Sequence, residues 1–428
     1  MMMKSRYVMW TVAVMLGVAT IASSVSVDAE GGLTLEERVE RLERRQELPP
    51  PAATDTSGLQ ERIDKLESHL KNLPFGIKLA GMVVSSYLYD LNEPDSDEVS
   101  LRSFDREHNS FVLDLLQLQV SRAPGENGVG FMTKVNFGKV AERMAADWDG
   151  DGTIGNVSEE QNSIEVQDAF VTYNFPGLPA LGFKAGKFVT LHGAEMIESP
   201  LNYNISRSLA FSFAIPFTHT GAMASYAISP EVHFHAGIVN GWDNVVDSND
   251  GKSFHGGVTY GPCKHFSLGV GGMYGAEQPD RGDSKRGLVD VVATVKPIDD
   301  LSLSLNYDYG NETDLAVTSG TAEWQAFSGI VAYDITDVFA VPVGFAVRGE
   351  YFDDSDGTRL PSPGGPGPYQ NAWEVTGTFK LVLAEGLDLR TEYRYDAAKN
   401  DLFEKELRRG NDLRGDQHTV AAELSYVF

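Results

Sequence analysis

Sixteen segments of alternating residues follow one another from about residue 75 onward, and this repetition restricts the fold more than any other feature of the 428-residue chain. Within each segment every second residue shares a face, which is typical of β-strands. The segments are 76–90, 111–122, 129–137, 164–175, 181–189, 218–228, 231–240, 252–260, 264–275, 286–296, 300–310, 323–333, 338–352, 370–383, 387–396 and 417–428. Their even number suits strands that run alternately up and down.

The links between these segments alternate in length. The short links are 123–128, 176–180, 229–230, 261–263, 297–299, 334–337 and 384–386. The long links, rich in Asp, Asn and Gly, are 91–110, 138–163, 190–217, 241–251, 276–285, 311–322, 353–369 and 397–416. An up-and-down barrel explains this asymmetry, whereas a propeller or stacked sandwiches would not. Residues 75–428 are therefore predicted to form a 16-stranded antiparallel transmembrane up-and-down β-barrel with both ends in the periplasm.

The two faces of these segments differ in polarity. One face carries aliphatic residues followed by aromatic ones, as at Val171 and Tyr173, and should face outer-membrane lipid. Charge on a lipid face would cost a few kcal/mol near mid-bilayer, so the charged face should line water. The predicted pore-lining residues are Lys134, Lys184, Asp290, Arg348, Glu374, Lys380, Arg390, Glu392, Arg394 and Glu423. In a soluble sheet the same residues would form a solvated face.

The last segment, 417–428, alternates strictly and stops on an aromatic residue. Such an ending resembles the closing strand of bacterial outer-membrane barrels, although an ordinary soluble sheet can also end in a strand. The resemblance implies that Tyr426 and Phe428 are an assembly signal for the barrel-assembly machinery. We expect this strand to pair with 76–90, with Tyr426 and Phe428 toward lipid and Glu423 toward water.

The amino-terminal region has a different character. Lys4 and Arg6 precede an apolar run at 7–22, and Val27 and Ala29 suit the −3 and −1 positions of a cleavage site. Residues 1–29 are therefore predicted to be a signal peptide, with a membrane-anchor helix as the alternative.

Residues 30–74 have Leu and Ile at helical spacing, interrupted by a proline-rich break at 48–51. Isolated short helices are marginal in water, so this apolar seam needs a partner. We predict a periplasmic α-helical coiled-coil segment between subunits. A single helix packed on the barrel mouth is the alternative.

The long link 190–217 is too apolar for an ordinary surface loop. If it folds into the lumen, its charged and imidazole side chains would sit at a constriction. The predicted constriction residues are His192, Glu195, Glu198, Arg207 and His219. Arg207 could face Glu195 or Glu198 across the bore and create a transverse field. Alternatively, these charges satisfy one another and pin the loop.

Several motifs in this region resemble those of the OmpL-like putative β-barrel porins. They are GKF at 186–188, Glu195, SP at 199–200, Asn202, SRS at 206–208 and PFTHTG at 216–221. The resemblance covers most of 76–428 and implies an outer-membrane barrel that acts as a passive channel. It carries over no catalytic residues.

The segment 147–152 reads DWDGDG, which matches the first half of an EF-hand calcium loop. Asp147, Asp149 and Asp151 could therefore bind Ca²⁺ within a loop at 147–160. The twelfth position is Ser158 rather than Glu, so an acidic extracellular turn is the alternative reading.

The remaining chemistry argues against other functions. With 61 acidic and 35 basic residues the net charge is −26, which disfavours nucleic acid as a partner. Cys263 is the only cysteine, so no internal disulfide can form.

His233 and His235 share a strand face and His255 lies on a neighbouring segment, which suits either metal ligation or a lumen lining. Recognisable hydrolase and metalloprotease motifs are absent, so we do not expect an enzyme and expect no required cofactor.

We therefore predict a homotrimeric outer-membrane porin that passes small hydrophilic solutes or ions by diffusion. The alternative is a structural barrel that tethers the envelope through its periplasmic helix.

Overall fold

The computed structural model describes residues 76–125, 128–145, 164–313, 320–335, 341–354, 356–360, 370–405 and 413–428. The predicted signal peptide, the helical segment 30–74 and the DWDGDG motif lie outside these residues. Within them, no helix is both long and apolar enough to cross a membrane.

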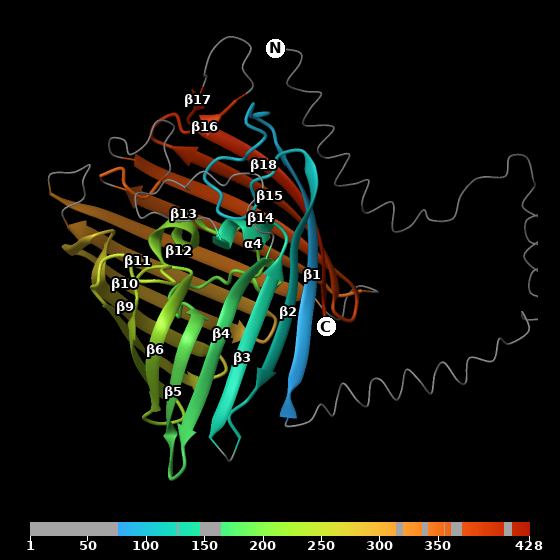
Figure 1. Cartoon of the computed structure of the whole chain (residues 1–428). Helices are drawn as coiled ribbons and strands as arrows, with labels where there is room; N and C mark the ends of the chain where they lie inside the picture. The colour runs from blue at the N-terminus through green and yellow to red at the C-terminus, as the bar shows by residue number, and fades with distance from the viewer. Residues whose placement is uncertain are drawn as a thin grey trace, which may run out of the picture. The chain divides into compact units, whose positions relative to one another are not determined.

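Sixteen antiparallel strands close into a barrel, as the sequence predicts (Figure 1). They are β1 (Lys78–Asp90), β2 (Ser110–Arg122), β3 (Val129–Phe137), β4 (Ile164–Phe175), β5 (Leu178–Val189), β6 (Thr218–Ala227), β7 (Val232–Val239), β8 (Ser253–Cys263), β9 (Phe266–Gln278), β10 (Arg281–Ile298), β11 (Leu301–Thr313), β12 (Thr321–Ile335), β13 (Val343–Asp354), β14 (Gln370–Ala384), β15 (Leu387–Ala398) and β18 (Asp416–Val427). Consecutive strands are neighbours throughout, which is the up-and-down topology.

Three further elements lie in the long loops. Helix α4 (Lys139–Ala145) follows β3, and the short strands β16 (Phe403–Glu404) and β17 (Leu413–Arg414) pair with each other between β15 and β18. The loop between β5 and β6 contains a 3₁₀ turn, Ser199–Leu201, and a π-helical turn, Ala210–Ala214. None of these elements was predicted from the sequence.

The barrel closes where β18 pairs with β1, as predicted. Val83 lies opposite Tyr426 in the register. The Gly81 and Phe428 backbones exchange hydrogen bonds of 2.9 and 3.0 Å. Tyr426 and Phe428 are exposed on the outside, whereas Glu423 is buried inside. The terminal strand therefore has the two faces expected of it.

Some strand ends differ from the predicted ones. The segment expected at 338–352 begins only at Val343, directly after Pro342, which has no N–H to donate to a ladder. Conversely, β5 begins at Leu178, inside the predicted short link 176–180. Gly177 has φ of +88°, which allows a tighter turn than expected.

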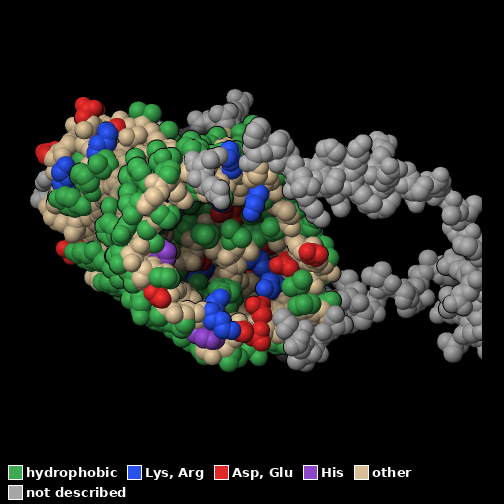
Figure 2. Space-filling model, turned by 90° about the horizontal axis from the view of Figure 1, so that it is seen from below, with side chains coloured by type: hydrophobic (Ala, Val, Ile, Leu, Met, Phe, Trp, Pro, Cys, Tyr) green, Lys and Arg blue, Asp and Glu red, His purple; other side chains and the backbone are tan. Residues whose placement is uncertain are grey.

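The exposure of side chains alternates along the strands, because every second side chain points into the barrel and is covered there. In β12 the inward residues Trp324, Ala326 and Ser328 are buried, whereas Phe327 and Val331 are exposed. Figure 2 shows hydrophobic side chains over the outer wall and a hollow at the end of the barrel that it views, with basic and acidic side chains inside the rim. A continuous apolar exterior around a charged interior suits a bilayer.

Candidate functional site

The loop 190–217 turns inward from the wall between β5 and β6. Its two ends are held together by a 2.9 Å hydrogen bond from the Thr190 N–H to the Phe217 carbonyl. His219 supports the same junction, since its Nε2 lies 3.1 Å from Thr190 Oγ1 and its Nδ1 lies 3.3 Å from the Gly241 carbonyl. Six apolar residues of the loop are buried, namely Ile197, Leu209, Phe211, Phe213, Ile215 and Phe217, whereas Leu191, Met196 and Leu201 are exposed. The loop is packed rather than solvated, as its composition predicts.

Glu195 and Glu198, three positions apart in the loop, are held by different parts of the wall. Glu195 accepts a 2.8 Å bond from Arg348 on β13. Glu198 accepts a 2.8 Å bond from Lys134 on β3, with Gln117 on β2 and Gln167 on β4 at 3.0 and 2.8 Å. The strands β3 and β13 are separated by β2, β1, β18, β15 and β14 around the barrel. The loop therefore spans the interior between them.

Wall carboxylates bind the N–H groups of the next part of the loop. Glu392 on β15 accepts bonds of 2.6 and 3.0 Å from the N–H groups of Ile205 and Ser206. Glu350 on β13 accepts bonds of 2.5 and 3.1 Å from those of Leu209 and Ala210. Each of these two carboxyl groups accepts hydrogen bonds from two successive loop N–H groups, so together they fix a stretch of loop that lacks a regular ladder.

Wall guanidinium groups bind the loop carbonyls in the same region. Arg348 donates to the Ser206 carbonyl at 2.6 Å, and Arg394 donates to the Arg207 carbonyl at 2.6 Å. Arg390 donates to the Asn202 carbonyl at 2.9 Å and also pairs with Glu423. Acidic and basic wall residues together satisfy the loop backbone on both its donor and acceptor sides.

All ten predicted lining residues lie on strands and point inward, but their surroundings differ from the prediction. Asp290, Arg348, Glu374, Arg390, Glu392, Arg394 and Glu423 are buried instead of open to water. The cause is that the loop covers most of them and uses them as anchors. Lys134, Lys184 and Lys380 keep part of their surface exposed.

The five predicted constriction residues are all buried in the interior, but Arg207 does not form an ion pair with Glu195 or Glu198. Its guanidinium donates to the carbonyls of Ile205, at 3.0 Å, and Ile197, and it lies 5.0 Å from the centre of the Phe104 ring. The two glutamates bind wall residues instead. The two glutamates and Arg207 therefore do not satisfy one another, and the groups that hold them are wall side chains and loop carbonyls.

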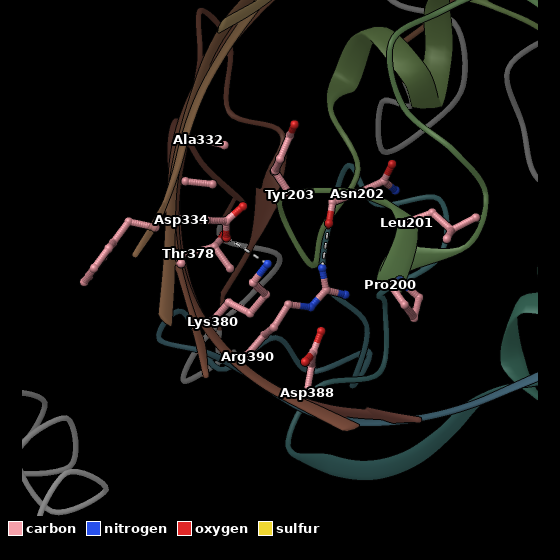
Figure 3. A pocket seen from close by; sticks show the side chains of 13 residues that line it. Pro200, Leu201, Asn202, Tyr203, Ala332, Asp334, Thr378, Lys380, Asp388 and Arg390 are labelled. Atoms are coloured by element: carbon pink, nitrogen blue, oxygen red, sulfur yellow. Dashed lines mark hydrogen bonds and ion pairs between the residues drawn. The ribbon is translucent and has the colours of Figure 1, made fainter. Parts of the chain in front are cut away.

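A cavity of about 220 Å³ lies between the loop and the strands β12 to β15 (Figure 3). Loop residues 200–203 form one side, and the strand residues on the other side include Asp334, Lys380, Asp388 and Arg390. Figure 3 shows Lys380 and Asp334 pointing toward each other, with 2.9 Å between Nζ and Oδ1. Charged groups of both signs therefore border open space beside the loop.

Sequence reasoning missed the inward folding of the loop at 91–109. Leu101 and Phe104 are buried, and the Phe104 ring lies 5.4 Å from that of Phe217. Arg102 is also buried and pairs with Asp396 on β15 at 2.8 Å. Apolar residues on both sides of an arginine, within a link of mostly polar residues, were the signal that could have revealed this contact.

Asp243, in the loop after β7, anchors the end of the 190–217 loop. Its Oδ1 accepts bonds of 2.7 Å from the N–H groups of Phe217 and Thr218. Burial raises the pKa of Asp243 to about 6, although these two N–H donors act in the opposite direction. This anchor therefore changes its charge near neutral pH.

Comparison with known proteins agrees with this architecture. Residues 76–428 match the family described as "Putative beta-barrel porin-2, OmpL-like". No curated protein sequence is significantly similar to the chain.

Several solved structures share the fold at low sequence identity. The anion-selective porin from Comamonas acidovorans is 11% identical with a TM-score of 0.55, over 82% of this chain and 99% of that one. OprB of Pseudomonas putida is 11% identical with a TM-score of 0.54, over 85% and 97%. OmpT of Vibrio cholerae is 12% identical with a TM-score of 0.53, over 82% and 97%.

The family match spans the barrel that the strands form, and the similar structures share its fold. The chain therefore belongs to the OmpL-like β-barrel porin family and is a porin of the bacterial outer membrane.

Proposed function

We propose that this porin is a water-filled channel for passive diffusion of small hydrophilic solutes and ions, and that the loop 190–217 narrows its bore. The observation that carries the proposal is the placement of Glu195 and Glu198 against β13 and β3. The backbone between Glu195 and Glu198 is three residues long and can reach only about 10 Å. A loop held at both places leaves room for solutes only beside it.

Two cavities beside the loop support this view. One, shown in Figure 3, borders residues 200–203, and the other, also of about 220 Å³, borders Leu191 and Gly193. Each has loop residues on one side and wall residues on the other. Solutes are proposed to pass through such spaces, bordered by charged groups such as Lys380 and Asp290.

The test is conductance in planar bilayers and swelling of liposomes in sugars of increasing size. We expect discrete conductance steps and a sharp size limit for the sugars. Replacing 196–208 with a short Gly-Ser linker should raise both the conductance and the size limit. Absence of both steps and swelling in the folded protein would refute the channel, and an unchanged size limit in the shortened variant would refute the narrowing.

We propose that the porin assembles as a homotrimer. OmpT of Vibrio cholerae, which shares the fold with a TM-score of 0.51 at 11% identity, occurs in a trimer form. Native mass spectrometry of the protein in detergent should give a trimer mass. A monomer mass over a range of mild detergents would exclude stable trimers.

The helical spacing of Leu and Ile in the sequence of 30–74 motivates a second candidate, a barrel that tethers the envelope. Deleting 30–73 separates the alternatives. Loss of envelope attachment with unchanged conductance would favour tethering, whereas loss of trimers would favour a coiled coil between subunits.

The motif at 147–152 supports a proposed Ca²⁺ site formed by Asp147, Asp149 and Asp151. Trp148 lies inside the motif and can sensitise Tb³⁺ luminescence, with Ca²⁺ as a competitor. We expect the signal to disappear in Asp149→Asn. An equal signal in that variant would refute the site.

A further inference from the structure

Four imidazole rings gather on the inner wall where β6, β7 and β8 lie side by side. His255 on β8 is at the centre of the group. Its ring centre lies 4.9 Å from that of His219 on β6, 6.2 Å from that of His235 on β7 and 6.3 Å from that of His192 in the loop. His192 and His255 are each only 3% exposed. The group is separate from the charged residues that anchor the loop at β13 to β15.

Four of the eight ring nitrogens of this group are buried without a hydrogen-bond partner in the described part of the chain. These are Nε2 of His192, Nε2 of His235, and both nitrogens of His255. A buried polar atom without a partner is costly and needs an explanation, such as a bound ion. His219 differs, because both its nitrogens have partners at Thr190 and Gly241. Three histidines therefore retain free nitrogen lone pairs.

Glycines on β7, β8 and β9 make the space that these rings occupy. A Cβ atom on Gly237 would lie 2.5 Å from Nε2 of His255, and one on Gly257 would lie 3.0 Å from Cε1 of His235. On Gly271 it would lie 2.9 Å from Nδ1 of His192. Any other residue at these positions would displace a ring. Each of the three histidines thus lies over a glycine that gives it room.

The niche opens into a cavity and has an adjacent carboxylate. His235, Gly271 and Asp290 line the second cavity of about 220 Å³. Asp290 Oδ2 lies 3.8 Å from Nδ1 of His192, on the opposite side of the ring from the free Nε2. This separation is too long for a hydrogen bond, and a small movement of either side chain would let Asp290 accept one from Nδ1, as carboxylates do when they orient a metal-binding histidine.

We infer that His192, His235 and His255 bind a divalent transition-metal ion such as Zn²⁺, with Asp290 positioning His192. Imidazole nitrogens suit zinc, copper and nickel, whereas calcium and magnesium need oxygen ligands. Zinc–nitrogen bonds of about 2.0–2.1 Å place two tetrahedrally arranged ring centres about 5 Å apart. The rings of His192 and His235 must therefore each come about 1 Å closer to the ring of His255.

Among the described residues, no three His, Cys, Asp or Glu side chains already converge on one point. Binding consequently requires the rings to reorient toward one another, and the cavity that His235 and Gly271 line adjoins the group on one side. Lys184 lies close to the histidine group. Its Nζ is 4.3 Å from the centre of the Phe188 ring, and that ring centre is 6.1 Å from the ring centre of His255. The positive charge of Lys184 therefore opposes a bound cation. A site that needs reorientation beside a lysine should bind metal weakly and exchange it readily.

The test is titration of the folded porin in detergent with Co²⁺, whose visible absorption reports nitrogen ligation, followed by competition with Zn²⁺. We expect at least tenfold weaker binding in His255→Gln and His235→Gln, and tighter binding in Lys184→Gln. His233→Ala is the matched control, because His233 lies on the same strand but is exposed and contacts the Pro230 carbonyl. Its binding should equal that of the unaltered protein.

Absence of a nitrogen-ligated Co²⁺ spectrum, or an equal spectrum in His255→Gln and in the unaltered protein, would overturn the inference. A band shift on heating in SDS verifies that each variant is folded. Metal binding does not depend on conductance, so a protein that binds Co²⁺ through His255 without conducting would refute the proposed channel and support the metal site.

Discussion

Arg348 on β13 and Glu195 in the inward loop form a buried ion pair, with 2.8 Å between Nη1 and Oε1. The same guanidinium bonds to Glu374 on β14 at 2.7 Å and to the Ser206 carbonyl at 2.6 Å. One side chain thus joins two strands to two points of the loop. Because the partners are buried, removing it would leave carboxylates without a counter-charge.

Replacing Arg348 with Met should therefore release the loop and destabilise the barrel. Removal of one member of a buried pair costs about 3–5 kcal/mol. We expect a larger and noisier single-channel conductance together with a lower unfolding temperature in detergent. Bilayer recordings and thermal unfolding of the same preparation provide the two measurements.

Lys264→Met is the control for this change. Lys264 pairs with Asp299 at 2.7 Å, but both side chains are about 70% exposed at a short turn. Exposed pairs contribute about 1 kcal/mol or less, so neither conductance nor stability should change appreciably. Similar behaviour of the two variants would contradict the anchoring role of Arg348.

Lys380 should influence ion selectivity because it borders the cavity between loop and wall. Lys380→Glu places a negative charge beside Asp334 and Asp388, which line the same cavity. We expect the reversal potential in a KCl gradient to move toward the potassium equilibrium potential. Lys264→Glu makes the same charge change at an exposed turn outside the cavity. An equal shift in both variants would indicate a general surface effect and exclude a local one.

The raised pKa of Asp243 predicts that the stability of the folded protein falls as pH rises. Its folded pKa of about 6 lies above the ordinary value of 3.8, so the folded state binds its proton more tightly than the unfolded state. Its contribution to stability is therefore fully present below pH 4 and is lost as pH rises through about 6. Asp243→Asn should remove this loss and stabilise the protein at pH 8, by at most about 3 kcal/mol.

The measurement for Asp243 is the unfolding temperature of both proteins between pH 4 and pH 8. The difference between them should grow with pH over this range. A constant difference would show that Asp243 does not titrate in it. Asp247→Asn is a useful comparison, because Asp247 lies in the same loop and pairs with Lys252, and its pKa is lowered instead.

The barrel could be predicted from the sequence because the features that indicate it lie within short stretches of the chain. The strand period of two and the alternation of link lengths are visible in short windows, so all sixteen strands were found. The burial of the loop 190–217 was predictable for the same reason, since its own apolar residues indicate it.

The partners inside the barrel depend on closure and could not be predicted. Glu195 and Arg348 lie 153 positions apart, and Arg102 and Asp396 lie 294 apart. The chain carries many arginines and glutamates that could pair, and only the completed strand order selects among them. The inward fold of 91–109 was missed because its anchor, Asp396, lies near the opposite end of the chain.

Closure of the barrel depends on the close approach of Phe428 and of the Gln117 backbone to Gly81. A Cβ atom there would lie 2.6 Å from Cζ of Phe428 and 2.6 Å from the Gln117 carbonyl oxygen. Gly81→Val should therefore force β1 away from β18 and β2, and lower the yield of folded barrel in detergent refolding. The band shift on heating in SDS measures that yield.

Gly377 provides the control, because a Cβ on this outward residue of β14 would have no atom within 4 Å. Gly377→Val should refold like the unaltered protein, and equal yields for both variants would contradict a closure defect. Deleting Phe428 separates closure from recognition. If Phe428 is chiefly a signal to the barrel-assembly machinery, its loss should reduce assembly in cells far more than refolding in detergent, whereas Gly81→Val should impair both.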